Sequence, residues 1–199
     1  MAKTGVTVVL DKTQDVLKGI AALTENRVYA GVPSTKAQRS DEDGEPINNA
    51  ALMYIHENGA PEVGIPPRPV VHPAIKDAQS QIEAALKATG IAALNGGAGA
   101  VMRGYTAVGL IAQNAMRTRI TEGPFVPLKP ATIANRARQR GTKRRKGEQQ
   151  YLDMVKGGMS PAAAQSAAGI RPLVDSGQLR SSLTYVIRKL TWAGKPARL

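Results

Sequence analysis

Residues 73–121 read PAIKDAQSQIEAALKATGIAALNGGAGAVMRGYTAVGLIAQNAMRTRIT, and this stretch decides the expected fold. Pro73 is well placed as the first residue of a helix, because its fixed φ suits the first turn and its missing N–H needs no partner there. Apolar residues recur at helical spacing on both sides of the glycine-rich break at 96–99. The stretch therefore predicts two long helices, which form either a helical hairpin or one kinked helix.

Two segments outside this stretch are predicted strands. Residues 27–32 form a short run that Pro33 ends, and residues 183–190 form a second run. We expect both strands to lie in one small antiparallel sheet. The sequence thus predicts an α+β fold in which this sheet packs against the two long helices. One domain is expected over residues 1–199, with three accessory segments: a flexible loop at 34–46, a basic insertion-like region at 141–170 and a frayed tail at 195–199.

Shorter elements are predicted from capping residues and from local patterns. Thr13 is expected to cap the helix that follows it, because a Thr hydroxyl can accept a hydrogen bond from an early helical N–H group. A helix over residues 48–57 is expected to end at Gly59 in a left-handed conformation. Asp175 is expected to cap a further short helix, and a weak alternation over residues 7–10 indicates a strand.

The amino-acid composition limits both the core and the chemistry. Hydrophobic residues make up 42% of the chain and aromatic residues 4%, so we expect a core of Ala, Val, Leu, Ile and Met in closely packed helices. The absence of Cys excludes disulfides, zinc–thiolate sites and cysteine nucleophiles. No segment reaches the roughly 18 apolar residues of a membrane span. Residues 1–10 lack the apolar run of a signal peptide, so no membrane partner is expected.

Positive charge is concentrated in one half of the chain, whose net charge is +12. Residues 1–100 carry 9 Lys and Arg against 11 Asp and Glu, whereas residues 101–199 carry 18 against 4. This imbalance favours a polyanionic partner or an acidic protein surface, although a solvated basic face would give the same pattern. One basic run without acidic residues comprises Arg136, Arg138, Arg140, Lys143, Arg144, Arg145 and Lys146. The run can neutralise phosphates but offers no base stacking, because it contains no aromatic residue.

The sequence offers no recognisable catalytic or metal site. His56 and His72 belong neither to an H-x-x-x-H nor to an H-E-x-x-H pattern. The acidic residues at 41–45 lack the alternating ligand spacing of a calcium loop. The glycines at 96–99 lack the Gly-Lys-Ser/Thr ending of a phosphate loop. We therefore expect no enzyme activity, no cofactor and no metal.

Three segments carry a more specific signal. Residues 49–59 read NAALMYIHENG, residues 65–75 read IPPRPVVHPAI, and residues 172–185 read PLVDSGQLRSSLTY. In the same order, these segments resemble the tail-completion and head–tail joining proteins of long-tailed bacteriophages, which are also called minor tail or virion morphogenesis proteins. Residues 127–133, which read PLKPATI, are similar to a further stretch of that family.

The resemblance implies a structural virion protein of the phage neck, made in the host cytoplasm. Such a protein completes the tail and joins it to the head connector as part of a homo-oligomeric ring around the DNA channel. The ring is expected to be sixfold or twelvefold, with head connector or adaptor proteins and the tail terminator as neighbours. The expected contacts with a neighbouring subunit are Ile65, Pro66, Arg68 and Pro69. The basic run is expected to face genomic DNA in the channel or an acidic partner.

The sequence leaves two alternatives open. Arg68, on its stiff proline-rich segment, could form an intersubunit contact or a structural salt bridge. The chain could also be a free basic nucleic-acid-binding protein, which would bind DNA as a monomer in a salt-dependent way. Val70 and Val71 depart from the family pattern, because they stand where Phe is usual.

Overall fold

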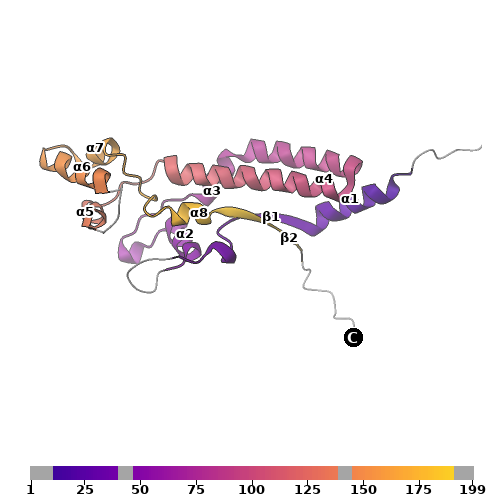
Figure 1. Ribbon diagram of the computed structural model, residues 1–199, viewed down its shortest axis with the longest axis horizontal. Helices are drawn as coiled ribbons and strands as arrows, with labels where there is room; N and C mark the ends of the chain where they lie inside the picture. Colours follow the sequence, from indigo (N-terminus) through magenta and orange to yellow (C-terminus); the bar gives the residue numbers. More distant parts are fainter. Residues whose placement is uncertain (1–10, 40–46, 139–144, 191–199) are drawn as a thin grey trace, which may run out of the picture. The chain divides into compact units, whose positions relative to one another are not determined.

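The protein is described by a computed structural model that covers residues 11–39, 47–138 and 145–190. It is mostly helical and contains a two-stranded antiparallel sheet (Figure 1), so the predicted α+β class is confirmed. The elements in chain order are α1 Thr13–Glu25, β1 Asn26–Gly31, the 3-10 helix η1 Ser34–Lys36, α2 Asn49–Asn58, the 3-10 helix η2 Pro61–Val63, α3 Val71–Asp77, α4 Gln79–Glu122, α5 Pro130–Arg138, α6 Arg145–Lys156, α7 Pro161–Ala167, α8 Gln178–Ser182 and β2 Thr184–Lys189.

The chain divides into two compact units, each built from segments that are distant in the sequence. The sheet unit consists of the described residues within 1–31, 75–115 and 184–199. The second unit consists of the described residues within 32–74 and 116–183. The expected single domain over the whole chain stays a prediction. No helix in the described part of the chain combines the length and apolar character needed to cross a membrane.

The sheet lies where the two predicted strands were expected. β1 pairs with β2 in an antiparallel register that runs from Asn26 opposite Lys189 to Gly31 opposite Thr184. The N–H of Leu190 also donates to the carbonyl of Glu25 at 2.6 Å, which continues the pairing past the strand ends. The prediction that both strands share one small sheet is therefore confirmed.

The long helix α4 is a helical hairpin, which decides between the two arrangements left open by its sequence. Gly97, with φ 63° and ψ −159°, interrupts the helix in a conformation that favours glycine. Figure 1 shows the segments before and after this residue running next to each other. They approach closely, because a Cβ on Gly104 would overlap the side chain of Thr89, which is itself buried.

The sheet packs against the second segment of this hairpin. A Cβ on Gly109 would overlap the ring of Tyr185, so the absence of a side chain at Gly109 makes room for the strand. The Thr184 hydroxyl donates to Oε1 of Gln113 at 2.7 Å beside this contact. Glycine on a helix therefore sets how closely β2 approaches α4.

Small side chains dominate the core of the sheet unit, as the composition predicts. Ala22, Ala93 and Val101 are buried together with Tyr105, whose hydroxyl donates to the carbonyl of Leu23 at 2.9 Å. Further partly buried residues that pack against this cluster are Leu23, Val28 and Ile187. The backbone of α1 thus satisfies the polar atom of the Tyr105 ring.

In the second unit, α5, α6 and α7 gather around a separate core (Figure 1). Ile133, Tyr151 and Ala164 are its most buried members, with exposed fractions of 0%, 1% and 0%. Ser160 caps α7 by accepting from the N–H of Ala163. The described part of the insertion-like region at 141–170 is therefore largely helical and has apolar side chains of its own to bury.

Several local predictions are wrong in detail. Thr13 does not cap α1; it is the first residue of the helix, whose cap position is Lys12, and its N–H donates to Oδ1 of Asp11 at 2.8 Å. The residue that precedes α8 as its cap is Gly177 and not Asp175. Pro73 is the third residue of α3 and not the first residue of a long helix. Within the expected insertion-like region, α6 begins at Arg145.

Other local predictions hold in part or are not covered. Gly59 ends α2 with the expected positive φ of 77°, but its ψ of 178° is not that of a left-handed helix. Residues 34–36 of the expected flexible loop form η1. The rest of that loop from residue 40, the strand predicted over 7–10 and the tail at 195–199 lie outside the described residues.

Candidate functional site

The first two motif segments bind each other through a single carboxylate in the second unit. Oε2 of Glu57, near the end of α2, accepts from the N–H groups of Val70 and Val71 at 2.7 and 2.9 Å. Oε1 of the same residue accepts from the N–H of His72 at 2.9 Å. These are N–H groups at the start of α3, which have no partner within their own helix. Glu57 therefore caps α3 from another helix.

A tight loop delivers the proline-rich segment to this place. Ala60 and Ile65 exchange backbone hydrogen bonds of 2.9 and 3.0 Å and close the loop between them. Gly59 lies at its base, where a Cβ would come within 3.0 Å of the Ile65 carbonyl oxygen. The N–H of Arg68 then donates to the carbonyl of His56 at 2.6 Å. The segment that follows Ile65 is thus fixed to the end of α2.

Arg68 is held by backbone carbonyls. Its side chain is 7% exposed, Nε donates to the carbonyl of Val126 at 3.0 Å, and Nη2 donates to that of Pro127 at 3.4 Å. Burial, followed by the nearby charge of Arg136, lowers the pKa of the Arg68 guanidinium from its ordinary value. In the described residues no carboxylate forms an ion pair with Arg68, so the structural salt bridge considered above is replaced by carbonyl contacts.

The remaining predicted contact residues lie on the same segment with different exposure. Ile65 and Pro66 are half-buried, whereas Pro69 is exposed. Whether these residues contact a neighbouring subunit stays a prediction. The structure does bring the segment next to residues 126–127, since Arg68 bonds to both of their carbonyl groups.

Residues 172–183 of the third motif segment belong to the same unit, whereas Thr184 and Tyr185 belong to the sheet unit. Leu173, Leu179 and Leu183 are buried, with exposed fractions of 6%, 5% and 0%, and α8 packs against α2. Nη2 of Arg136 on α5 donates to the carbonyl of Pro172 at 3.1 Å. Nε of Arg117 donates to the carbonyl of Leu183 at 3.0 Å, where α8 ends. Arginine-to-carbonyl bonds therefore hold both ends of this segment.

These segments enclose a pocket of about 440 Å³, which lies entirely in the second unit. The positively charged side chains that line it are Arg39, Arg68, Lys129 and Arg136. Asp175 is the acidic residue among the lining residues, and His56 also lines the pocket. Apolar parts of the wall come from Leu52, Ile65, Leu128, Leu173 and Leu179. The described wall is therefore both basic and apolar.

The pKa of His56 is affected by its burial and by the positive charges around it. Burial, and then the charges of Arg68, Arg136 and Arg39, lower the pKa of this imidazole from 6.5 to about 4. Nδ1 of His56 is buried and has no hydrogen-bond partner within the described ranges. The ring is consequently neutral at physiological pH, which leaves the arginines and the lysine to supply the positive charge of the pocket.

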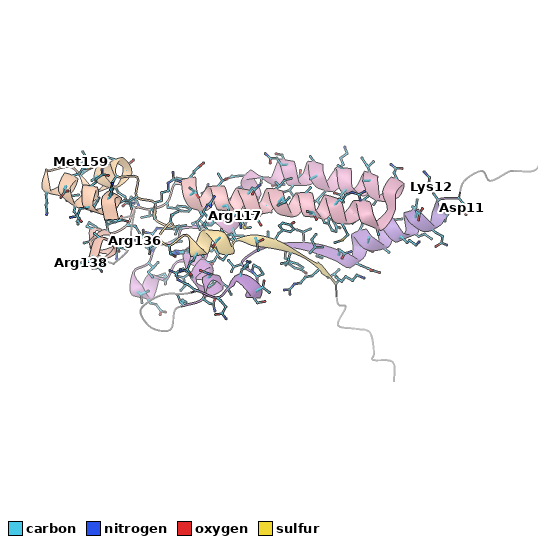
Figure 2. All side chains as sticks on the ribbon, in the orientation of Figure 1. Asp11, Lys12, Arg117, Arg136, Arg138 and Met159 are labelled. Carbon is cyan, nitrogen blue, oxygen red and sulfur yellow. The ribbon has the colours of Figure 1, made fainter. Side chains whose placement is uncertain are left out.

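The structure does not gather the predicted basic run into one described surface. Arg136 is half-buried and lines the pocket, whereas Arg138 on the same helix is exposed; Figure 2 labels both side chains at α5. Lys146 is exposed near the start of α6. Arg145 is the first residue of α6, and Arg140, Lys143 and Arg144 lie outside the described residues.

The pocket contains residues that sequence reasoning missed. Arg39 and Lys129 each stand apart from the basic run, and although Lys129 lies in the quoted stretch 127–133, no pattern of charge singles out either residue. Glu57 lies within a motif segment, but its capping contact depends on where α3 begins. His72, by contrast, is exposed. In residues 11–39, 47–138 and 145–190, no group of three His, Asp or Glu side chains is close enough to hold a metal ion.

The chain was compared with protein-family models, with curated proteins and with solved structures. None of the three comparisons gives a match. The resemblance to phage neck proteins therefore rests on the quoted segments alone. What the geometry adds is that Glu57 of the first segment bonds to the second segment, and that α2 and α8, which carry the first and third segments, pack together in the second unit.

Proposed function

We propose that this chain is a structural, non-enzymatic virion protein of the neck of a long-tailed bacteriophage. It completes the tail and joins it to the head connector as one subunit of a homo-oligomeric ring around the DNA channel. One observation carries the proposal: segments that resemble the neck proteins are bound to one another in the fold, and one of them is also bound to a distant part of the chain. Glu57 joins the first segment to the second, and Arg68 joins the second to residues 126–127.

The polar residues of the motifs support this proposal through their partners. Glu57 accepts hydrogen bonds from backbone groups of the second motif segment, and Arg68 donates to the carbonyl groups of Val126 and Pro127, which fixes these stretches at defined positions. Such an arrangement suits a scaffold that presents a rigid surface, because a pre-ordered segment loses little entropy when it docks. The stiff stretch from Ile65 to Pro69 is the part proposed to contact a neighbouring subunit.

Exposed apolar side chains of the sheet unit favour assembly into an oligomer. On α1, Leu17 and Ile20 are 54% and 43% exposed, and on α4, Ile91 and Leu94 are 56% and 50% exposed. The two residues of each pair are three positions apart in the sequence and so lie on one side of their helix. Burial of such side chains against copies of the same chain would stabilise a ring, which closes when one head-to-tail interface repeats around an axis.

The experiment is to image this protein in intact particles. We expect a reconstruction of the neck to place a sixfold or twelvefold ring of this chain on the head–tail axis. Particles made without the protein should accumulate as separate heads and tails. A reconstruction with the chain elsewhere, or with a single copy at the axis, would contradict the proposal. A monomer in dilute solution would not, because such a ring can require a template to form.

A second candidate function is that of a free basic nucleic-acid-binding protein. The observation that favours it is the exposure of Arg138 and Lys146, two members of the basic run. Binding would be salt-dependent and independent of sequence, because cationic side chains release counterions from phosphates. Tight binding of duplex DNA by a monomer that is absent from particles would support this function over the neck function.

A further inference from the structure

We propose that the pocket of the second unit binds an acidic peptide segment of a partner protein, in which a carboxylate side chain stands next to an apolar one. The inference rests on the proposed function and deepens it, because Ile65, Pro66 and Arg68 line the pocket and are also the expected subunit contacts. It states the chemistry that the neighbouring protein must offer at this place.

The charge of the wall favours an anionic ligand. Four of the lining side chains are cations, Arg39, Arg68, Lys129 and Arg136, and one, Asp175, is an anion. The depressed pKa of His56 is in keeping with this excess, since three of these arginines disfavour its protonation. A ligand carboxylate would gain favourable interactions with the cations, which no neutral group could match.

Arg68 places a positive charge at a fixed position in the wall of the pocket. Its Nε and Nη2 are bound to the carbonyl oxygens of Val126 and Pro127, which hold the side chain but do not neutralise its charge. Because the guanidinium is already ordered and largely desolvated, a ligand does not have to immobilise it. Lys129 supplies a second cation at the pocket. The residue is exposed, and its Nζ donates to the Gly64 carbonyl at 3.3 Å.

The size and the apolar wall favour a peptide over nucleic acid. A volume of about 440 Å³ is in the range of pockets that enclose small ligands or side chains. Leu52, Leu128 and Leu179 contribute apolar surface that an aliphatic side chain can cover. The phosphates of a DNA duplex lie on a convex backbone and bring no apolar group into such a space.

The test is a selection of a random heptapeptide library with the purified full-length chain. We expect the selected peptides to be enriched in Asp or Glu next to Leu, Ile or Val. The variant Lys129→Glu reverses one charge at the pocket. The matched control, Lys156→Glu, makes the same change at an exposed lysine of α6 in the same unit, away from the pocket. Circular dichroism verifies that both variants are folded.

Affinity is then measured by fluorescence anisotropy with the most enriched peptide and with its Asn/Gln counterpart. We expect Lys129→Glu to weaken binding roughly fivefold or more, Lys156→Glu to leave it within twofold, and the neutral peptide to bind far less tightly. A duplex oligonucleotide and inorganic phosphate serve as competitors. The proposal is overturned if the selection shows no acidic enrichment, if the two variants behave alike, or if the DNA or phosphate binds at Lys129 and the peptide does not.

Failure of this inference is distinguishable from failure of the proposed function. A ring of this chain in the neck together with a pocket that selects no acidic peptide would overturn only the inference. A pocket that selects acidic peptides in a protein absent from the neck would overturn only the neck function. The two results are read from different samples, the first from particles and the second from the purified chain.

Discussion

The contacts that stabilise the sheet unit differ in kind from those that stabilise the second unit. In the sheet unit, glycines at 104 and 109 let the two segments of α4 and the strand β2 approach closely. In the second unit, the side chains of Glu57, Arg68 and Arg136 bind backbone groups of other segments. The first kind of contact is sensitive to volume and the second to charge. Substitutions that change only the volume or only the charge of a side chain should therefore affect the stability of one unit and not of the other.

The largest effect is expected from Glu57→Ala in the second unit. It removes a carboxylate that accepts three hydrogen bonds at the start of α3, and we expect a loss of about 3 kcal/mol in the free energy of unfolding. Urea denaturation measures it. Glu62→Ala, at an exposed position of η2, is the matched control and should stay within about 0.5 kcal/mol. Equal losses for both variants would show that Glu57 does not cap α3.

Arg68→Ala should destabilise the second unit almost as much. It removes a buried side chain together with its hydrogen bonds to the carbonyl groups of Val126 and Pro127, and we expect a loss of about 2 kcal/mol. Arg68→Lys should recover only part of this loss, because an ammonium cannot reproduce the planar fork. A variant of unchanged stability that fails to join heads to tails would instead assign Arg68 entirely to a subunit contact.

In the sheet unit, Gly109→Ala should cost about 2 kcal/mol, because the new Cβ would overlap the ring of Tyr185. Gly90→Ala, on the same helix, is expected to change the stability in the opposite direction. No atom lies within 4 Å of its added Cβ, so the gain in helix propensity should stabilise the protein by about 0.5–1 kcal/mol. Thermal unfolding of both variants checks this, and a stabilising Gly109→Ala would refute the close approach of β2.

The pH dependence of stability is expected to come from the second unit through His56. Its pKa falls from 6.5 to about 4 on folding, so protonation favours the unfolded chain. The stability that the neutral ring provides is fully present above pH 6.5 and is lost as the pH falls toward 4. Between pH 7 and pH 5 we expect a loss of about 1–2 kcal/mol that is absent from His56→Gln. His72→Gln, at an exposed position, should keep the pH dependence of stability. If this variant also loses the pH dependence, His56 is not its cause.

The smallest effect on stability is expected for exposed basic residues of the second unit. Arg138→Gln with Lys146→Gln should change the free energy of unfolding by less than about 0.5 kcal/mol. If these residues contact DNA, the slope of log K against log salt concentration should fall by about 2. Lys87→Gln with Arg103→Gln removes the same charge from the sheet unit. Identical slopes for the two double variants would mean that the basic run has no special contact with DNA.

The fold could largely be predicted from the sequence, because its elements are marked by local patterns. Helical spacing on both sides of the break at 96–99 predicted the two segments of α4, and short runs predicted β1 and β2. The choice between hairpin and kinked helix could not be made in advance. It depends on the backbone angles of Gly97, and a run of glycines allows several.

The pocket was much less predictable. Arg68 was singled out because prolines flank it, but its partners, the carbonyls of residues 126–127, come from a distant part of the chain. Arg39 and Lys129 look like ordinary surface cations in the sequence and become part of a basic wall only when the segments meet. Charge runs are visible in a sequence, whereas charges that gather by tertiary folding are not.

The pairing of β1 with β2 has a consequence for the order of events during synthesis. Residues 32–183 separate the two strands, so β1 leaves the ribosome long before its partner exists. Closing so long a loop carries an entropic cost that the strand contacts must offset, and contacts of high sequence separation form late. The segments of the second unit, in contrast, are all translated before β2. We therefore expect the sheet to be the last structure to form on the nascent chain, with the backbone of β1 unpaired with β2 until then.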